Sequence, residues 1–147
     1  MKRNLLLAGL LVFTSVLALA ATYERGKRAQ PPAIREFMRQ KLAHSQAVLE
    51  GLSVEDYSQI LSNAKKLIAM SQDGNWAVLG GAEYAELSQN FRRNAEALVK
   101  AANLASLDGA TLAYVRVTMS CVECHKYVRS RQNASISSEN TVIAALR

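Results

Sequence analysis

The apolar residues of this chain recur mostly at spacings of three and four, which is the period of one face of an α-helix. The longest such run lies between Ala33 and Leu52, and Pro31-Pro32 precede it. Proline suits the first turn of a helix, because the amide hydrogen that it lacks has no partner there. We therefore expect an amphipathic helix over 33–52. Its inner stripe comprises Ile34, Phe37, Met38, Leu42, Val48, Leu49 and Leu52.

A second helix is expected to follow almost at once and to end near Met70. Ser53, Glu55 and Asp56 precede its apolar stripe, and a hydroxyl cap with acids in the first turn is typical of a helix start. Gly51 weakens the end of the first helix. Because the connection is short, the two helices should form an antiparallel pair.

The segment from Ser71 to Gly81 breaks the helical period with three glycines. It predicts a loop, with Trp76 as its apolar plug. A third helix is expected from Ala82 to about Ala105, and Asp108-Gly109 should open a fourth.

These four segments, with no alternating strand pattern, predict an all-α fold, an antiparallel four-helix bundle over 33–131. The chain has 147 residues, half of them hydrophobic, which suits one compact domain. Gln132 to Asn140 is rich in serine and asparagine, so we expect 132–147 to form a flexible C-terminal tail.

The N-terminus has the pattern of a secretory signal peptide. Lys2 and Arg3 precede an uncharged apolar run that ends in Ala18-Leu19-Ala20, so residues 1–20 should be cleaved off. An uncleaved membrane anchor is the alternative, but the run is shorter than the ~20 residues that span a bilayer. Residues 21–32 are predicted to be a linker, and the protein is expected in the periplasm.

Loss of Lys2 and Arg3 would lower the formal net charge from +6 to +4. The remaining basic residues are scattered and form no dense stripe with interleaved aromatics. This pattern gives no support for a nucleic-acid partner.

The chemical signal is Cys121-Val122-Glu123-Cys124-His125, near the end of the fourth predicted helix. Cys-x-x-Cys-His is the attachment motif of c-type haem. At 100° per residue, Cys124 lies about 60° to one side of Cys121 and His125 about 40° to the other. Two thioether bonds to one haem c and an axial imidazole can therefore come from one helix face.

Three other interpretations of these residues are weaker. A zinc site would need about four ligands, and His44 is the one further histidine. A thioredoxin-like pair belongs at a helix start after a strand. A plain disulfide would leave the adjacent histidine unexplained.

On these residues the chain resembles the cytochrome c' family over roughly Ile34 to Arg131. The most specific match is Ser120 through His125 followed by Arg129, with weaker agreement at three further positions: Trp76, Phe91 and Asp108. The resemblance implies one covalent haem with a solvent-accessible edge, a haem-edge role for Arg129, and often a homodimer through the first two helices. The chain departs from the family in placing Tyr127, rather than an aromatic at position 128, after the histidine.

The resemblance also assigns the sixth iron position to the first helix. A methionine there is typical of the electron-transferring relatives, and an apolar residue of the gas-binding ones. Met38 is our candidate ligand and Leu42 its rival. If the family's propionate-binding arginine is Arg35, Met38 faces the iron; if it is Arg39, the site moves toward Leu42 or Ala43. His44 is a third, weaker candidate.

Two functions remain open at this stage. With Met38 as ligand, the protein would be a one-electron carrier that docks on redox partner proteins. With an open sixth position, it would bind nitric oxide or another small gas. Nothing around the motif indicates an enzyme, because it lacks a second set of acid-base residues.

Overall fold

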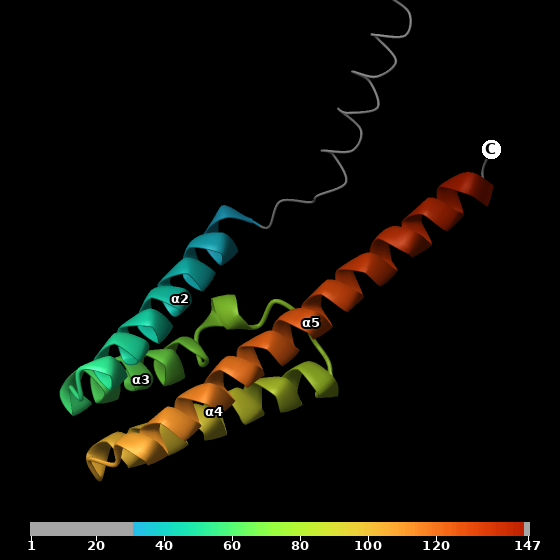
Figure 1. Cartoon of the computed structure of the whole chain (residues 1–147). Helices are drawn as coiled ribbons and strands as arrows, with labels where there is room; N and C mark the ends of the chain where they lie inside the picture. Colours follow the sequence, from blue (N-terminus) through green and yellow to red (C-terminus); the bar gives the residue numbers. More distant parts are fainter. Residues whose placement is uncertain (1–30, 146–147) are drawn as a thin grey trace, which may run out of the picture. The chain divides into compact units, whose positions relative to one another are not determined.

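The computed structural model describes residues 31–145 (Figure 1). The predicted signal peptide and nearly all of the predicted linker lie outside this range. The chain forms two compact units, Met1–Arg35 and Glu36–Arg147. Of the first unit the structure describes the last five residues, in which the Arg35 amide donates to the Pro31 carbonyl (3.1 Å).

The described residues fold into four α-helices and one short 3₁₀ turn, without a strand. This confirms the predicted all-α fold and the predicted order of helices. The elements are α2 (Pro32–Ser53), α3 (Tyr57–Met70), η1 (Gly74–Trp76), α4 (Ala82–Asn103) and α5 (Leu107–Ala145).

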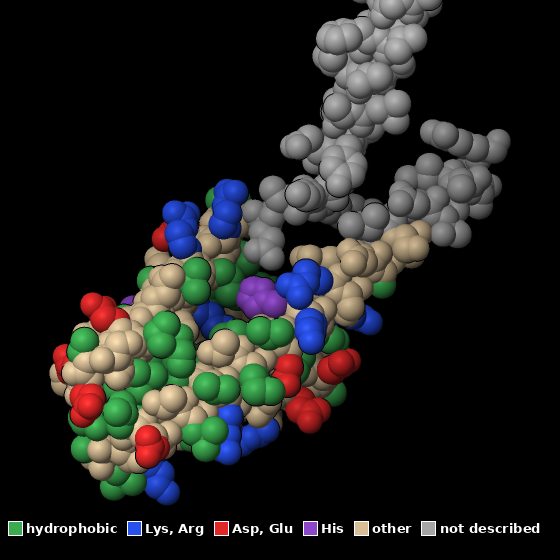
Figure 2. All heavy atoms as spheres, viewed as in Figure 1, with side chains coloured by type: hydrophobic (Ala, Val, Ile, Leu, Met, Phe, Trp, Pro, Cys, Tyr) green, Lys and Arg blue, Asp and Glu red, His purple; other side chains and the backbone are tan. Residues whose placement is uncertain are grey.

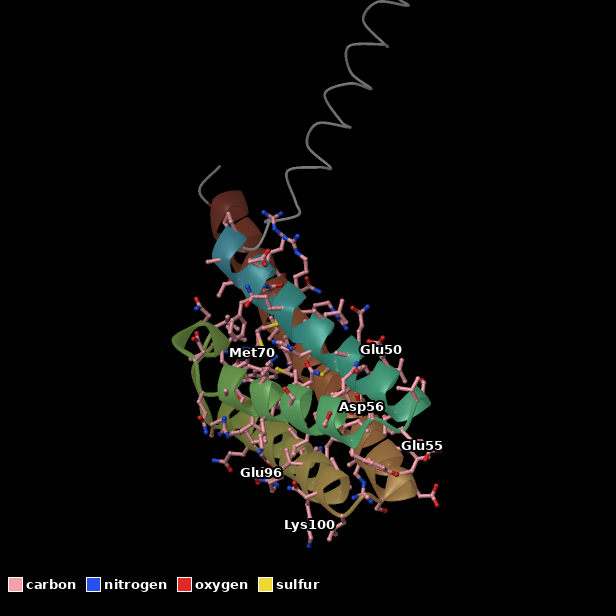
Figure 3. The ribbon with its side chains drawn as sticks, turned by 90° about the vertical axis from the view of Figure 1, so that its left-hand side faces the viewer. Glu50, Glu55, Asp56, Met70, Glu96 and Lys100 are labelled. Carbon is pink, nitrogen blue, oxygen red and sulfur yellow. The ribbon has the colours of Figure 1, made fainter. Side chains whose placement is uncertain are left out.

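A tight turn joins α2 to α3 and makes them an antiparallel pair. The carboxylate of Asp56 caps α3 by accepting from the amide of Gln59 (2.9 Å), so the cap lies three residues after the predicted Ser53. Figure 3 shows Asp56 at this junction. The Gln59 side chain donates back to the Ala47 carbonyl (3.0 Å). A Cβ on Gly51 would lie 3.0 Å from Ile60 Cγ1, so the two helices approach closely here.

Helix α4 packs extensively against α5 and also against α3. Small buried residues of α5 let it approach α4 closely: Ala110 and Ala113 are almost inaccessible, and Val117 is fully buried. On the α4 side, Leu98 and Phe91 fill the core. The motif-bearing segment of α5 is thus held firmly against the rest of the bundle.

The structure differs from the prediction at the C-terminus. Helix α5 does not end near Arg131 but continues to Ala145, where we expected a flexible tail. No glycine or proline follows Gly109, and serines in this stretch hydrogen-bond to the helix itself. The Ser135 hydroxyl, for example, donates to the Gln132 carbonyl (2.8 Å). A polar composition therefore did not interrupt the helix. Within 31–145, no helix has an apolar stretch long enough to cross a membrane.

Candidate haem-binding site

The three motif residues lie on one side of α5, as the helical spacing predicted. Cys121 and Cys124 are free and partly buried, and both pack against the hydrophobic core. His125 is exposed at the edge of a cavity that it lines together with Cys121. Figure 2 shows a histidine on this face, with hydrophobic and basic side chains beside it.

The cavity between α2 and α5 has a volume of about 340 Å³. Its wall is predominantly apolar, which suits the porphyrin of a haem. Met38, Leu42 and Ser45 of α2 lie across from Cys121 and His125 of α5. The complete lining is Met38, Lys41, Leu42, Ser45, Leu67, Phe91, Tyr114, Val117, Thr118, Cys121 and His125. Cys124 is not part of this lining and packs against the core beside it. The Cys121 thiol, an imidazole and an apolar wall at one cavity fit a covalently attached haem.

Helix α2 presents both predicted rivals for the sixth position to this cavity. Met38 is half-buried and packs against the core, whereas Leu42 is 56% exposed. One turn further along, the hydroxyl of Ser45 donates to the Tyr114 hydroxyl (3.4 Å), a contact that ties α2 to α5. The more enclosed of the two rivals is therefore Met38.

Lys41 is the member of the site that sequence reasoning missed. Its side chain is only 6% exposed, although it carries a charged group. The Nζ atom lies 4.1 Å from the centroid of the Trp76 ring and 4.4 Å from that of Phe91, so two aromatic faces hold the ammonium by cation–π contact. Burial lowers the pKa of Lys41, and the neighbouring Cys121 and Cys124 oppose this shift.

The aromatic wall beneath Lys41 is fixed by buried hydrogen bonds. The indole N–H of Trp76 donates to the Ser88 hydroxyl (2.9 Å), which in turn donates to the Tyr84 carbonyl (2.8 Å). The Tyr84 hydroxyl donates to the Trp76 carbonyl. The rings of Trp76 and Phe91 pack with centroids 4.9 Å apart. Trp76 is therefore the loop's plug, as predicted, and also a wall of the site.

Two of the motif residues, Cys124 and His125, have shifted proton affinities. Partial burial lowers the pKa of His125, and the positive charges of Lys41 and Arg129 lower it further. A lowered pKa favours neutral imidazole, which is the form that ligates iron. Burial raises the pKa of the Cys124 thiol, against the opposing effect of Lys41.

A second hydrogen-bond cluster fixes α5 just before the motif. The Asn94 side-chain amide donates to the Ser120 hydroxyl (2.7 Å), and that hydroxyl donates to the Arg116 carbonyl (2.9 Å). Ser120 is buried, so Asn94 of α4 positions the turn of α5 that carries Cys121.

The remaining sequence candidates lie outside the cavity lining. His44 Nδ1 is 3.0 Å from Asn63 Oδ1, which places its ring against α3. Arg129 is exposed one turn after His125, and its charge acts on that ring. Arg35 is exposed in the first turn of α2, and Arg39 forms an exposed ion pair with Glu36 (2.9 Å).

The arrangement of helices is similar to that in solved structures of cytochrome c'. One cytochrome c' has a TM-score of 0.55 at 21% identity, over 64% of this chain and 89% of that chain. A ferrous variant from Alcaligenes xylosoxidans with bound nitric oxide has a TM-score of 0.55 at 23% identity, over 65% and 88%. Ferric cytochrome c' of the same organism has a TM-score of 0.54 at 22% identity, over 64% and 87%.

No protein-family model and no curated protein sequence matches this chain. The likeness to the solved structures is thus one of fold. It confirms the cytochrome c'-like four-helix bundle that the sequence resemblance predicted.

Proposed function

We propose that this chain is an exported c-type cytochrome with one covalently attached haem, and that it carries single electrons. The observation that best supports this proposal is the cavity that Met38 and His125 line from opposite helices, with Cys121 beside the histidine. An imidazole and a thioether across one apolar cavity are a ligand set that keeps iron six-coordinate in both oxidation states.

Each motif residue has a role in this proposal. Cys121 and Cys124 form thioether bonds with the two vinyl groups, and neutral His125 ligates the iron from the α5 side. The haem, once bound, supplies a reversible one-electron couple between ferric and ferrous iron. Met38 provides the sixth ligand from α2. Arg129 and Arg35 are our candidates for charge pairing at the propionate edge.

The surroundings of the site are consistent with transfer to and from other proteins. His125 is exposed, so the motif lies close to the surface, where a partner can approach. The positive net charge would favour transient docking on acidic redox proteins. The signal-like segment 1–20 places the protein in the periplasm in this proposal, where covalent haem attachment takes place. A homodimer through α2 and α3 remains an expectation from the resemblance.

Gas binding is the second candidate, and one observation favours it. The cavity also exposes the apolar Leu42 beside Met38, and an apolar group over the iron would leave the sixth position open. Solved structures with this fold include one with bound nitric oxide. In that case Met38 would pack in the distal wall without ligating the iron.

Absorption spectroscopy of the purified haem protein separates the two functions. For the carrier we expect a low-spin spectrum with a methionine-to-iron charge-transfer band, which Met38→Ala abolishes. Met119→Ala is the matched control, because Met119 is an exposed methionine on α5, and it should leave the band intact. A high-spin ferrous protein that binds carbon monoxide at once would contradict the carrier and support gas binding.

Covalent attachment has its own test. The mass of the denatured polypeptide should include one haem. We expect Cys121→Ala and Cys124→Ala each to leave at most one thioether bond, and the double variant to lose covalent haem altogether. A wild-type chain that releases all its haem on denaturation would overturn the proposal.

A further inference from the structure

The buried ammonium of Lys41 has no role in the proposed ligand set, yet it lies in the same cavity. Lys41 lines that cavity between the Met38 and Ser45 positions of α2. Among the side chains of 31–135, no carboxylate forms an ion pair with the Lys41 ammonium. The ion pair in this range joins Arg39 and Glu36. A buried charge without a counter-ion is costly and therefore requires an explanation.

Two aromatic rings hold this charge in a fixed place. The distances of 4.1 Å and 4.4 Å from Nζ to the Trp76 and Phe91 centroids put the ammonium over both rings at once. Trp76 is in turn fixed by its hydrogen bond to Ser88. The structure thus uses buried aromatic contacts, rather than a carboxylate, to retain a positive charge beside the cavity.

Lys41 and two of the motif residues line the same cavity. The Lys41 side chain shares the lining with Cys121 and His125, and its charge also acts on Cys124 and His125. An iron held by His125 would therefore lie within electrostatic reach of the Lys41 ammonium.

We propose that the Lys41 ammonium is a fixed positive charge of the haem pocket that raises the reduction potential of the iron. Oxidation adds one positive charge to the haem. Two positive charges repel each other, and more strongly in a poorly solvated interior than in water. Lys41 therefore disfavours the ferric state relative to the ferrous state. This inference rests on haem attachment at the motif, but not on Met38 as the sixth ligand.

The test is a redox titration of the holoprotein, followed by its absorption spectrum. Lys41→Met removes the charge and retains much of the side-chain volume. We expect the ratio of reduced to oxidised protein at a fixed potential to fall at least tenfold, which is about 59 mV for one electron. Lys41→Arg retains the charge and should change that ratio less than about threefold, or about 28 mV at that same conversion.

Lys100→Met is the matched control, because it removes the same charge from an exposed position at the end of α4. It should leave the ratio within twofold of the wild type. If Lys41→Met does not assemble, Lys41→Gln provides the uncharged comparison. An uncharged variant with a wild-type potential would overturn the inference.

The same measurements keep this inference distinct from the proposed carrier function. If Met38 is not a ligand, the spectrum is high-spin and does not respond to Met38→Ala, but the potential should still fall in Lys41→Met. If Met38 is a ligand and Lys41 has no electrostatic role, the wild type shows the charge-transfer band, and Lys41→Met has the same potential as the wild type.

Discussion

Ser88→Ala should destabilise the protein through one buried hydrogen bond of the site's aromatic wall. The Ser88 hydroxyl accepts from the Trp76 indole N–H at 2.9 Å, and both side chains are about 5% exposed. Without it the indole donor stays buried and unsatisfied, which costs about 1–3 kcal/mol. Alanine recovers about 0.5 kcal/mol in helix propensity. The free energy of unfolding should therefore fall by about 0.5–2.5 kcal/mol.

Thermal unfolding of the holoprotein, followed by far-UV circular dichroism, measures this loss. At about 4–6 °C for each kcal/mol in a domain of this size, the Tm should fall by roughly 2–15 °C. The control is Ser62→Ala at an exposed position of α3, which should change the free energy by less than about 0.5 kcal/mol.

A double-mutant cycle with Trp76→Phe tests the stated cause. Phenylalanine has no N–H, so in that background Ser88→Ala leaves no indole donor without a partner. It should then be nearly neutral, which gives a coupling free energy of about 1 kcal/mol or more. An equal loss in both backgrounds would refute the reasoning, because the hydrogen bond to Trp76 would then not be the cause.

Two further predictions concern the turn between α2 and α3. Gly51→Ala should lower the free energy of unfolding by about 1 kcal/mol in a urea titration. The new Cβ would lie 3.0 Å from Ile60 Cγ1 and 3.1 Å from the Asp56 carbonyl oxygen, and overpacking costs of about 1–3 kcal/mol exceed the gain in helix propensity of about 1 kcal/mol. Gly74→Ala, which meets nothing within 4 Å, is the control; an equal loss there would contradict the packing argument. The hydrogen bond from the Gln59 amide lowers the pKa of Asp56. The charged carboxylate therefore stabilises the folded state fully at pH values above the unfolded pKa of about 3.9. This stabilisation is lost as the pH falls through the lower pKa of the folded state. Asp56→Asn keeps an acceptor oxygen but does not titrate, so the urea midpoints of the wild type and the variant should converge below about pH 4. A difference between the two midpoints that stays constant with pH would contradict this role of the Asp56 carboxylate.

The helices could be predicted because periodicity is a local property of the sequence. The loop around Trp76 appears in the structure as expected, and of the predicted α2 stripe Phe37, Val48 and Leu52 are buried. Leu42 and Leu49 were wrongly assigned to the inner stripe, because they are 56% and 50% exposed. The end of α5 could not be predicted in this way. Serine and asparagine lower helix propensity only slightly, and hydrogen bonds such as that from Ser135 to Gln132 accommodate them within the helix.

The two sides of the site, on α5 and on α2, also differ in how far they could be predicted from the sequence. The relative positions of Cys121, Cys124 and His125 depend only on the geometry of one helix, so their common face followed from their spacing. Met38 and Leu42 could not be ranked in that way, because their distance from His125 depends on how α2 packs against α5. In the structure both reach the cavity, and Met38 is the more enclosed.

Lys41, on the α2 side, is the site residue that the sequence analysis did not identify. It lies four residues after Phe37 and seven before Val48, so it occupies the inner stripe of α2. A binary pattern assigns lysine to solvent, and only Trp76 and Phe91, from other elements, make its burial tolerable. A lysine at an inner-stripe position was therefore a usable signal, but its aromatic partners could not be identified without the fold.

Met38 and Lys41 would act on the iron in the same direction, by different physical routes. A thioether ligand favours ferrous iron, and a nearby ammonium disfavours the extra charge of ferric iron. Their effects should nevertheless be separable. Met38→Ala would change both the spectrum and the potential, since it removes a ligand, whereas Lys41→Met would change the potential with the spectrum intact. Helix α2 would then set the reduction potential through two neighbouring turns, while α5 alone would attach the haem.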